Sequence, residues 1–278
     1  AIVVDTSGNL TFGGTSISGS STSTGSFGEV IVGGAEGRLR VTLYPGIANT
    51  VFGLGAGGSL QSSTQSNVII GTYAGINIYA DENTIVGKDS GRYLGQAYSN
   101  KNVAVGYRAL MGASSSPSTN SANNNVAVGY LAGGGVTEAY QNVLIGAYAG
   151  DAITTGQNNT ALGYAALSAE DTGTRNVAIG NETLKVLNYD GAGYNVAVGH
   201  RAGYALTTGT TNTFIGAFAG GATDDGTRNV VLGYAAMDTG NAGDDNIAIG
   251  YGALQDTTAS GNIAIGSYAM TQHTTGVR

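Results

Sequence analysis

Few residues of this chain are suited to acid–base or metal chemistry. There are two histidines, His200 and His273, and no cysteine, so thiol chemistry and disulfides are excluded. Acidic side chains occur as three adjacent pairs, at residues 170–171, 224–225 and 244–245. Carboxylate oxygens in loops can bind Ca²⁺, and two carboxylates that face each other across a groove can cleave a glycosidic bond. Either chemistry requires the fold to hold carboxylates at a set distance.

The elements that carry these residues are copies of one short motif, Asn-x-x-x-Gly. Thirteen copies run from Asn49 to Gly266, and the commonest step from one copy to the next is 17 residues. A fixed short period is typical of a solenoid, in which each repeat forms one coil. We number each coil from its motif asparagine, which is position 1. These asparagines are Asn49, Asn67, Asn83, Asn102, Asn125, Asn142, Asn159, Asn176, Asn195, Asn212, Asn229, Asn246 and Asn262.

Alignment of the coils on position 1 defines the expected fold. Position 2 is always Val, Ile or Thr, position 4 is large and apolar, position 5 is Gly and position 8 is small. Gly and β-branched residues in every coil disfavour a helix. The pattern predicts two short strands per coil, at positions 2–4 and at about positions 6–9, with a turn at the Gly and a polar connector to the next coil. We therefore expect an all-β chain, a parallel β-solenoid of about 13 coils, which makes a rod of about 60 Å.

The two faces of the first strand carry an expectation about partner chains. Strand side chains alternate, so positions 2 and 4 point one way and position 3 points the other. Position 3 is also apolar, and it is Ala in seven coils. A strand that is apolar on both faces is buried on both faces, but one thin coil can cover only one of them. We therefore predict a homo-oligomer, with a trimer favoured, in which the small Ala at position 3 allows chains to approach closely around an axis.

The motif asparagines and glycines are predicted to be structural, because they recur in every coil. Stacked Asn side chains can form a hydrogen-bonded ladder, and Gly permits a turn with positive φ. No catalytic, cofactor-binding or metal-binding residue is predicted. The structural positions chosen to represent the motif are Asn67, Gly71, Asn102, Gly106, Asn142, Gly146, Asn176, Gly180, Asn212, Gly216, Asn246 and Gly250.

Composition argues against several classes of protein. The net charge is −7 and the 11 basic residues are scattered, so a nucleic-acid-binding surface is not expected. The chain has no run of about 18 apolar residues, so no membrane-spanning helix is expected. Glycine is abundant, with 48 residues, but it lacks the period of collagen.

The chain divides into two parts at the first motif copy. Residues 1–48 are predicted to be an attachment or capping segment, and residues 49–278 the repeat shaft. In the first part, residues 13–26 are rich in Gly, Ser and Thr and are expected to form a loop. Two strand-like pieces lie between residues 29 and 43, and Asn9–Gly13 is interpreted as a degenerate motif copy.

The motif resembles repeats of two known families. Asn-Val-Ala-Ile-Gly at 176–180 and Asn-Ile-Ala-Ile-Gly at 246–250 and 262–266 resemble the head repeats of trimeric autotransporter adhesins. The longer unit at 158–167, with its Thr-, Gly- and Asp-rich connector, is similar to repeats of bacteriophage tail fibres. The resemblance covers about residues 49–278 and implies a left-handed β-roll and a homotrimer. It is specific for the fold and weak for the biological role, because both families use the repeat.

The remaining candidate sites have an ordinary structural interpretation. His200 occupies position 6, where other coils carry Tyr, and His273 lies in a connector, so both are expected at the surface. Stacked connectors would bring Asp225 and Asp245 near each other, but the chain lacks the Gly-rich calcium repeat. The connectors are too short to form the cleft of a polysaccharide-degrading enzyme, and Thr at position 2 is too irregular for an ice-binding array. Aromatic residues at positions 6 and 7 could form a carbohydrate or receptor platform, although packing between coils is favoured.

Together these observations predict an extracellular homotrimeric fibre, most simply a phage tail fibre of the virion that holds or forms a region binding a host cell-surface receptor, glycan or protein. Residues 1–48 would attach it to other fibre or virion proteins. Residues 275–278 match those that precede a motif asparagine at 172–175, so a longer fibre is expected. The first alternative is a trimeric adhesin head on a bacterial cell surface, and the second is a polysaccharide-degrading tailspike. The favoured fibre would not be an enzyme and would use no cofactor, contact no nucleic acid and not insert into a membrane.

Overall fold

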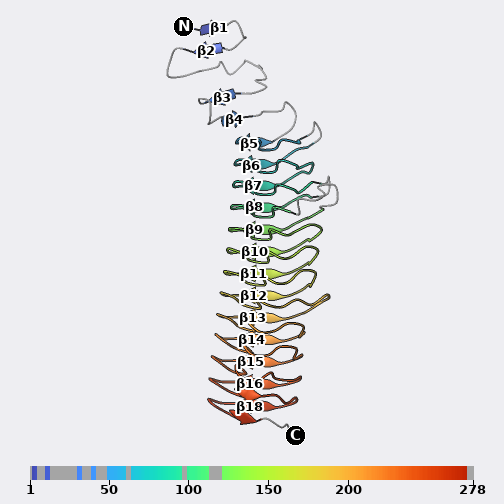
Figure 1. Ribbon diagram of the computed structural model, residues 1–278, viewed down its shortest axis with the longest axis vertical. Helices are drawn as coiled ribbons and strands as arrows, with labels where there is room; N and C mark the ends of the chain where they lie inside the picture. The colour runs from blue at the N-terminus through green and yellow to red at the C-terminus, as the bar shows by residue number, and fades with distance from the viewer. Residues whose placement is uncertain are drawn as a thin grey trace.

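The computed structural model is a β-solenoid whose coils stack along one long axis (Figure 1). It describes residues 49–60, 64–95, 99–112 and 121–273, together with the backbone of four strands before residue 49. Thirteen strands form one sheet in sequence order, and every neighbouring pair is parallel, so the prediction of a parallel β-solenoid is confirmed. Within the described part of the chain, no helix is long and apolar enough to cross a membrane.

Each strand of the sheet covers positions 2–4 of its coil. The register is the same throughout, as in Val143↔Thr160 and Ile145↔Leu162, so each side chain lies over its equivalent in the next coil. The strands are β5 (Thr50–Phe52), β6 (Val68–Ile70), β7 (Thr84–Val86), β8 (Val103–Val105), β9 (Val126–Val128), β10 (Val143–Ile145), β11 (Thr160–Leu162), β12 (Val177–Ile179), β13 (Val196–Val198), β14 (Thr213–Ile215), β15 (Val230–Leu232), β16 (Ile247–Ile249) and β18 (Ile263–Ile265).

The core is one narrow cluster inside the coils. The residue at position 3 is buried in every strand, while positions 2 and 4 are half-buried or exposed. Ala at positions 3 and 8 and an aliphatic residue from many connectors, such as Ile153 and Leu206, belong to this cluster. The expectation that Ala at position 3 lies between chains is therefore wrong: these Ala side chains fill the interior of their own coil, and the remaining coils bury a larger apolar residue, such as Phe214, at the same position.

The predicted second strand, at positions 6–9, is also absent from the described coils, which form turns there. The backbone has positive φ at the position 5 glycine, about 140° at Gly163, and again at position 7, with φ of 58° at Tyr148 and 50° at Ala165. Residues in the left-handed region curl the chain instead of extending it. Hydrogen bonds between coils continue through the turn, as in Tyr148 N–H to the Tyr130 carbonyl at 2.9 Å.

The position 1 asparagines form a continuous buried ladder. In each coil after the first, the Asn backbone N–H donates to Oδ1 of the preceding Asn, at 2.9 to 3.2 Å. The Nδ2 group often donates to a connector carbonyl that ends the coil, as from Asn142 to Gly156 at 2.9 Å. The ladder thus satisfies polar backbone groups that the core would otherwise bury without partners.

Short strands outside the main sheet pair among themselves. β1 (Ile2–Val4) pairs with β2 (Leu10–Phe12), and β3 (Val30–Val32) pairs with β4 (Leu39–Val41), both antiparallel. The interpretation of Asn9–Gly13 as a motif copy is therefore wrong, because β2 does not join the parallel stack. β17 (Asp256–Thr257) and β19 (Gln272–His273) form a parallel pair from two connectors. The expected loop at 13–26 lies outside the described residues.

Candidate functional site

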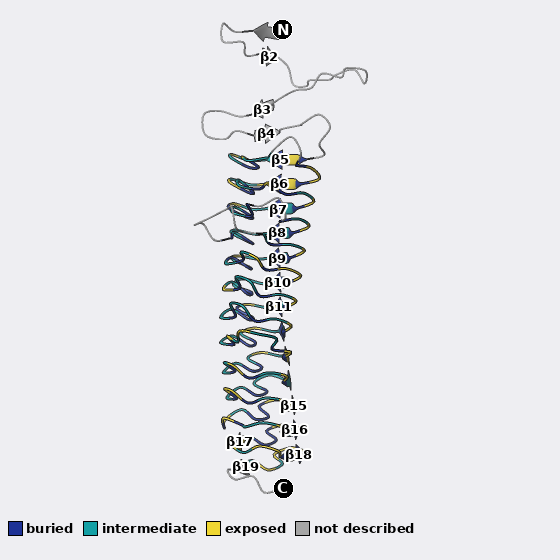
Figure 2. Ribbon diagram, turned by 90° about the vertical axis from the view of Figure 1, so that its right-hand side faces the viewer, coloured by how far each residue is buried: buried dark blue, intermediate teal, exposed yellow. Residues whose placement is uncertain are grey.

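The outward face of the sheet is a long apolar surface that the described residues leave half-buried or exposed. It consists of positions 2 and 4 of β5 to β16 and β18, and we call it the strand face. Its most exposed members are Ile263 and Ile265, at 64% and 68%, and Figure 2 colours parts of β5 and β6 as exposed. Every residue of the strand face is Val, Ile, Leu, Phe or Thr, so it carries no charge along its whole length.

The turn beside the sheet carries two runs of aromatic rings. In the first run, ring centroids of consecutive members lie 5.2 to 6.0 Å apart; its members are Tyr107, Tyr130, Tyr148 and Tyr164. In the second run the spacing is 5.1 to 5.8 Å; its members are His200, Phe218, Tyr234, Tyr251 and Tyr268. Each ring packs against the ring of the next coil, so packing between coils is the role that these contacts support.

A charged cluster separates the two aromatic runs. One coil has Asn181 and Glu182 at positions 6 and 7 in place of an aromatic residue. Glu182 forms ion pairs with Lys185 at 2.5 Å and with Arg201 at 2.7 Å. Hydrogen bonds from Lys185 and, as the next largest cause, from Arg201 lower the pKa of the Glu182 carboxyl.

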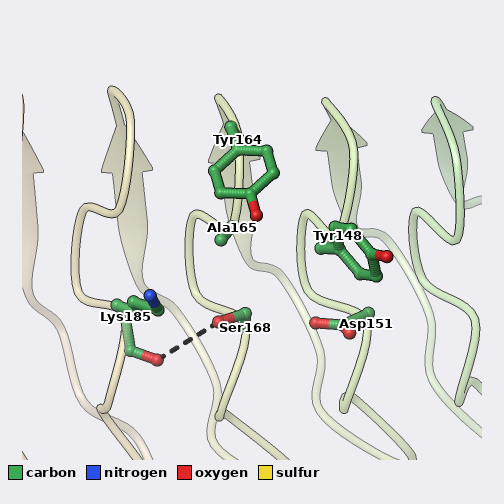
Figure 3. Close-up of a pocket in the computed structure, with 6 residues that line it drawn as sticks. All are labelled: Tyr148, Asp151, Tyr164, Ala165, Ser168 and Lys185. Carbon is green, nitrogen blue, oxygen red and sulfur yellow. Dashed lines mark hydrogen bonds between the residues drawn. The ribbon is translucent and has the colours of Figure 1, made fainter.

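A small hollow lies where the first aromatic run ends (Figure 3). Its volume is about 260 Å³. It exists because Ala165 occupies position 7 between Tyr148 and Glu182, which hold that position in the two adjoining coils. Its lining residues are Tyr148, Asp151, Tyr164, Ala165, Ser168 and Lys185.

The acidic residues singled out in the sequence are separated by the fold. Asp245 forms an ion pair with Arg228, at 2.7 Å, and Asp244 contacts the same Arg at 3.4 Å. Asp224 accepts a hydrogen bond from the Thr207 hydroxyl. The expected approach of Asp225 to Asp245 is not what the register produces: Asp245 lies over Arg228, one coil earlier, and Asp225 is aligned with Ala242 instead.

Glu170 belongs to one of the three adjacent acidic pairs of the sequence, and the structure buries it completely. It lies six residues before the next motif asparagine, where other coils have Val136, Ile153 and Leu206 in the core. The Gly173 N–H donates to its Oε1 at 2.7 Å, while Oε2 is buried without a partner. Burial raises the pKa of Glu170 to about 7. Alignment of the connectors backwards from the next asparagine would have revealed this core position.

The two histidines do not meet in a catalytic arrangement. His200 is the first member of the second aromatic run, and its ring is edge-on to that of Phe218, with the ring centroids 5.1 Å apart. His273 lies in β19, and its side chain is outside the described residues. Within the described ranges, no three His, Asp or Glu side chains gather closely enough to hold a metal ion.

The fold and these surfaces define a repetitive β-solenoid protein. Comparison of the chain with protein-family models, with curated proteins and with solved structures finds no match.

Proposed function

We propose that this chain is the shaft of an extracellular homotrimeric fibre, a phage tail fibre of the virion in the simplest case, which holds or forms a region that binds a host cell-surface receptor. The observation that carries the proposal is the strand face, an uncharged apolar surface that the chain's own residues leave uncovered. The repeat resembles those of phage fibres and adhesin heads, which supports the same assignment.

The size of the strand face favours a permanent partner. Thirteen strands at ~4.8 Å spacing extend over about 60 Å, and three strand residues span about 10 Å, so the face covers about 600 Å². The largest apolar patch on an ordinary monomer is about 300–600 Å². The strand face reaches the upper limit of that range and carries no charge, so a partner that covers it would remove a large apolar area from water.

A second copy of the same chain is the partner that fits this face best. The outward side chains repeat at the spacing of the coils, because the register is constant from β5 to β18. An identical rod has the same spacing, so its side chains can interdigitate along the whole length. A closed ring of such rods buries every strand face and leaves the connectors and aromatic runs at the surface.

Mass in solution tests this proposal. Light scattering of the wild-type chain should give about three times the monomer mass of 27.7 kDa. Ile179→Glu together with Val198→Glu places charges on adjacent coils of the strand face, and this variant should dissociate. Asn181→Glu, on an exposed turn residue of the same region, is the matched control and should stay trimeric. A wild-type chain that is folded and monomeric would overturn the proposal.

Two alternatives share the fold. A bacterial surface adhesin head would use the same trimeric roll, and the neighbouring genes separate it from a phage fibre. A polysaccharide-degrading tailspike requires a pair of facing carboxylates, and the pairing of Asp244 and Asp245 with Arg228 does not favour it. A reducing-sugar assay on capsular polysaccharide tests this second alternative.

A further inference from the structure

The hollow at the end of the first aromatic run has a polar floor and an aromatic wall. Asp151, Ser168 and Lys185 occupy position 10 of three consecutive coils, so they lie in one column along the rod. Tyr148 and Tyr164 stand above this column, and Figure 3 places the Asp151 carboxylate on the side that faces Ser168. The rings of Tyr148 and Tyr164 meet edge to face, at 82°, and Tyr164 is 50% exposed.

The carboxylate of Asp151 has hydrogen-bonding capacity that the protein does not use. Its Oδ1 atom is buried and has no hydrogen-bond partner. Burial raises the pKa of this carboxyl. An unpaired buried acceptor of this kind carries a desolvation cost. Oδ1 is closed to solvent as it stands, so a ligand hydroxyl would relieve this cost by donating to the carboxylate after the Asp151 side chain, which lines the hollow, rotates to expose Oδ1.

The other polar groups select against a charged ligand. The Lys185 ammonium is already paired with Glu182 at 2.5 Å, so it does not require an anion. It retains further N–H groups, because an ammonium has three. The Ser168 hydroxyl donates weakly to the Lys185 carbonyl at 3.4 Å. Donors and acceptors thus alternate along the floor, with an apolar ring surface above them.

We propose that this hollow binds one ring of a neutral sugar within a glycan chain. Hydroxyl groups of the sugar would donate to Asp151 and to the Ser168 oxygen and accept from Lys185, while its C–H face packs against Tyr164. The volume of about 260 Å³ lies just below the range of about 300–1,000 Å³ for pockets that enclose drug-sized ligands, which suits a single ring. For its biological role the inference rests on the fibre proposed above, since it names a glycan as the receptor; the binding itself does not require the trimer.

A second place in the rod offers an internal control. Tyr234 and Ala235 hold positions 6 and 7 of their coil, as Tyr164 and Ala165 do, and Tyr234 is 49% exposed. The position 10 column beneath it consists of Gly221, Asp238 and Gln255, so it lacks a cation. This second place has the same aromatic exposure and an Asp in the column, but neither the Ser nor the Lys, so it tests the contribution of the complete set.

Saturation-transfer NMR on the full chain tests the proposal, with the methyl glycosides of glucose, galactose, mannose and N-acetylglucosamine as probes. At least one should receive saturation, with a Kd in the millimolar range, as expected for a shallow site. Asp151→Asn removes one charged hydrogen bond and should weaken binding at least about tenfold. Tyr164→Ala removes the aromatic surface that packs against the sugar and should weaken binding by about as much. Tyr234→Ala should bind as the wild type does.

Three outcomes would overturn the sugar site. They are no transfer to any of the four glycosides, transfer that survives both Tyr164→Ala and Asp151→Asn, and equal loss in Tyr234→Ala. Light scattering of the same samples reports the oligomeric state separately. A monomer that binds sugar would refute the trimeric fibre and support the sugar site. A trimer that binds no sugar would support the trimer and refute the sugar site.

Discussion

The strand side of each coil, positions 1–5, and its connector side, the residues from position 10 to the next asparagine, tolerate different amounts of variation. On the strand side, the step between consecutive asparagines ranges from 16 to 23 residues, yet the ladder bond stays between 2.9 and 3.2 Å. On the connector side, equivalent places hold an aliphatic residue in one coil and a buried Glu170 in another. Variation in length and chemistry is absorbed by the connectors.

The strand side therefore builds the rod, whereas the connector side can give one part of the rod a binding site that the other parts lack. The elements of the strand side recur in all coils. They therefore determine the architecture, but they cannot mark a site that belongs to one coil. The hollow beside Asp151, the Glu182 cluster and the buried Glu170 each depend on side chains that differ from coil to coil, and all three lie in the turns and connectors. Substitutions on the two sides should therefore differ in both size and character.

The position 5 glycine column should be the most sensitive part of the rod. A Cβ at Gly163 would clash with the carbonyl oxygen of Gly180, and its φ of +140° strains any other residue. Gly163→Ala should lower the free energy of unfolding by roughly 5 kcal/mol, from backbone strain and steric overlap together. Chemical denaturation measures the loss.

Gly266 provides the matched control for this substitution. Its φ is +125°, but a Cβ there would meet only the Ala269 Cβ, at 4.0 Å. Gly266→Ala should therefore cost only the strain of the backbone, on the order of 1–3 kcal/mol. Equal losses at the two glycines would contradict the idea that contact between coils sets the cost.

Substitutions in the asparagine ladder should cause the next largest loss in the free energy of unfolding. The Asn195 side chain makes four hydrogen bonds, to Asn176 at 3.2 Å, to Gly209 at 2.9 Å and from the N–H groups of Asn212 at 3.0 and 3.2 Å. Asn195→Ala leaves several buried groups without partners and should cost roughly 4 kcal/mol. Hydrogen exchange should accelerate at the amide of Asn212, and the exposed Asn181→Ala should leave it unchanged. Protection that survives Asn195→Ala would show that the ladder is dispensable.

On the connector side, Glu170 should make stability depend on pH. Its pKa is about 7 in the folded chain against an ordinary value of 4.5. The folded state therefore holds a proton that the unfolded state releases, so this contribution is complete below pH 4.5 and is lost as pH rises towards 7 and beyond. The loss is at most about 3.5 kcal/mol, since one pKa unit corresponds to ~1.4 kcal/mol.

Glu170→Gln removes this titration and keeps the acceptor for the Gly173 N–H. The variant should match the wild type at pH 4 and exceed it in denaturation midpoint at pH 8. Glu138→Gln, at an exposed connector residue, controls for a general change in charge. A difference between wild type and Glu170→Gln that is the same at both pH values would exclude titration of Glu170 as its source.

The strand side was also the part that the sequence predicts well. The period, the strand at positions 2–4 and the parallel stack follow from residues that recur in every coil. The inward face was assigned wrongly, because positions 2, 3 and 4 are all apolar and only the volume of Ala indicates a thin interior. The prediction of a second strand was wrong because the pattern of apolar residues does not indicate which residues, such as Tyr148, adopt a left-handed backbone conformation.

The connector side resists prediction for a different reason. Glu170 beside Asp171 has the appearance of a solvated acidic pair, and only its place above Ile153 in the stack reveals its burial. The hollow arises from one Ala between two larger residues of adjacent coils, so it is a property of the stack and not of any local motif. The burial of Glu170 follows once the connectors are aligned backwards from the next asparagine, whereas the hollow becomes visible only when the coils are stacked in three dimensions.

The parallel stack also has a mechanical consequence. The hydrogen bonds between coils, such as Thr160 N–H to the Asn176 carbonyl at 2.8 Å, point along the long axis of the rod. A pull on the two ends therefore stretches each bond along its own direction, and the coils bear the load in series. A single chain would yield by peeling at its weakest coil, at a force that does not increase with the number of coils. Bundling rods side by side shares the load, whereas lengthening one rod does not.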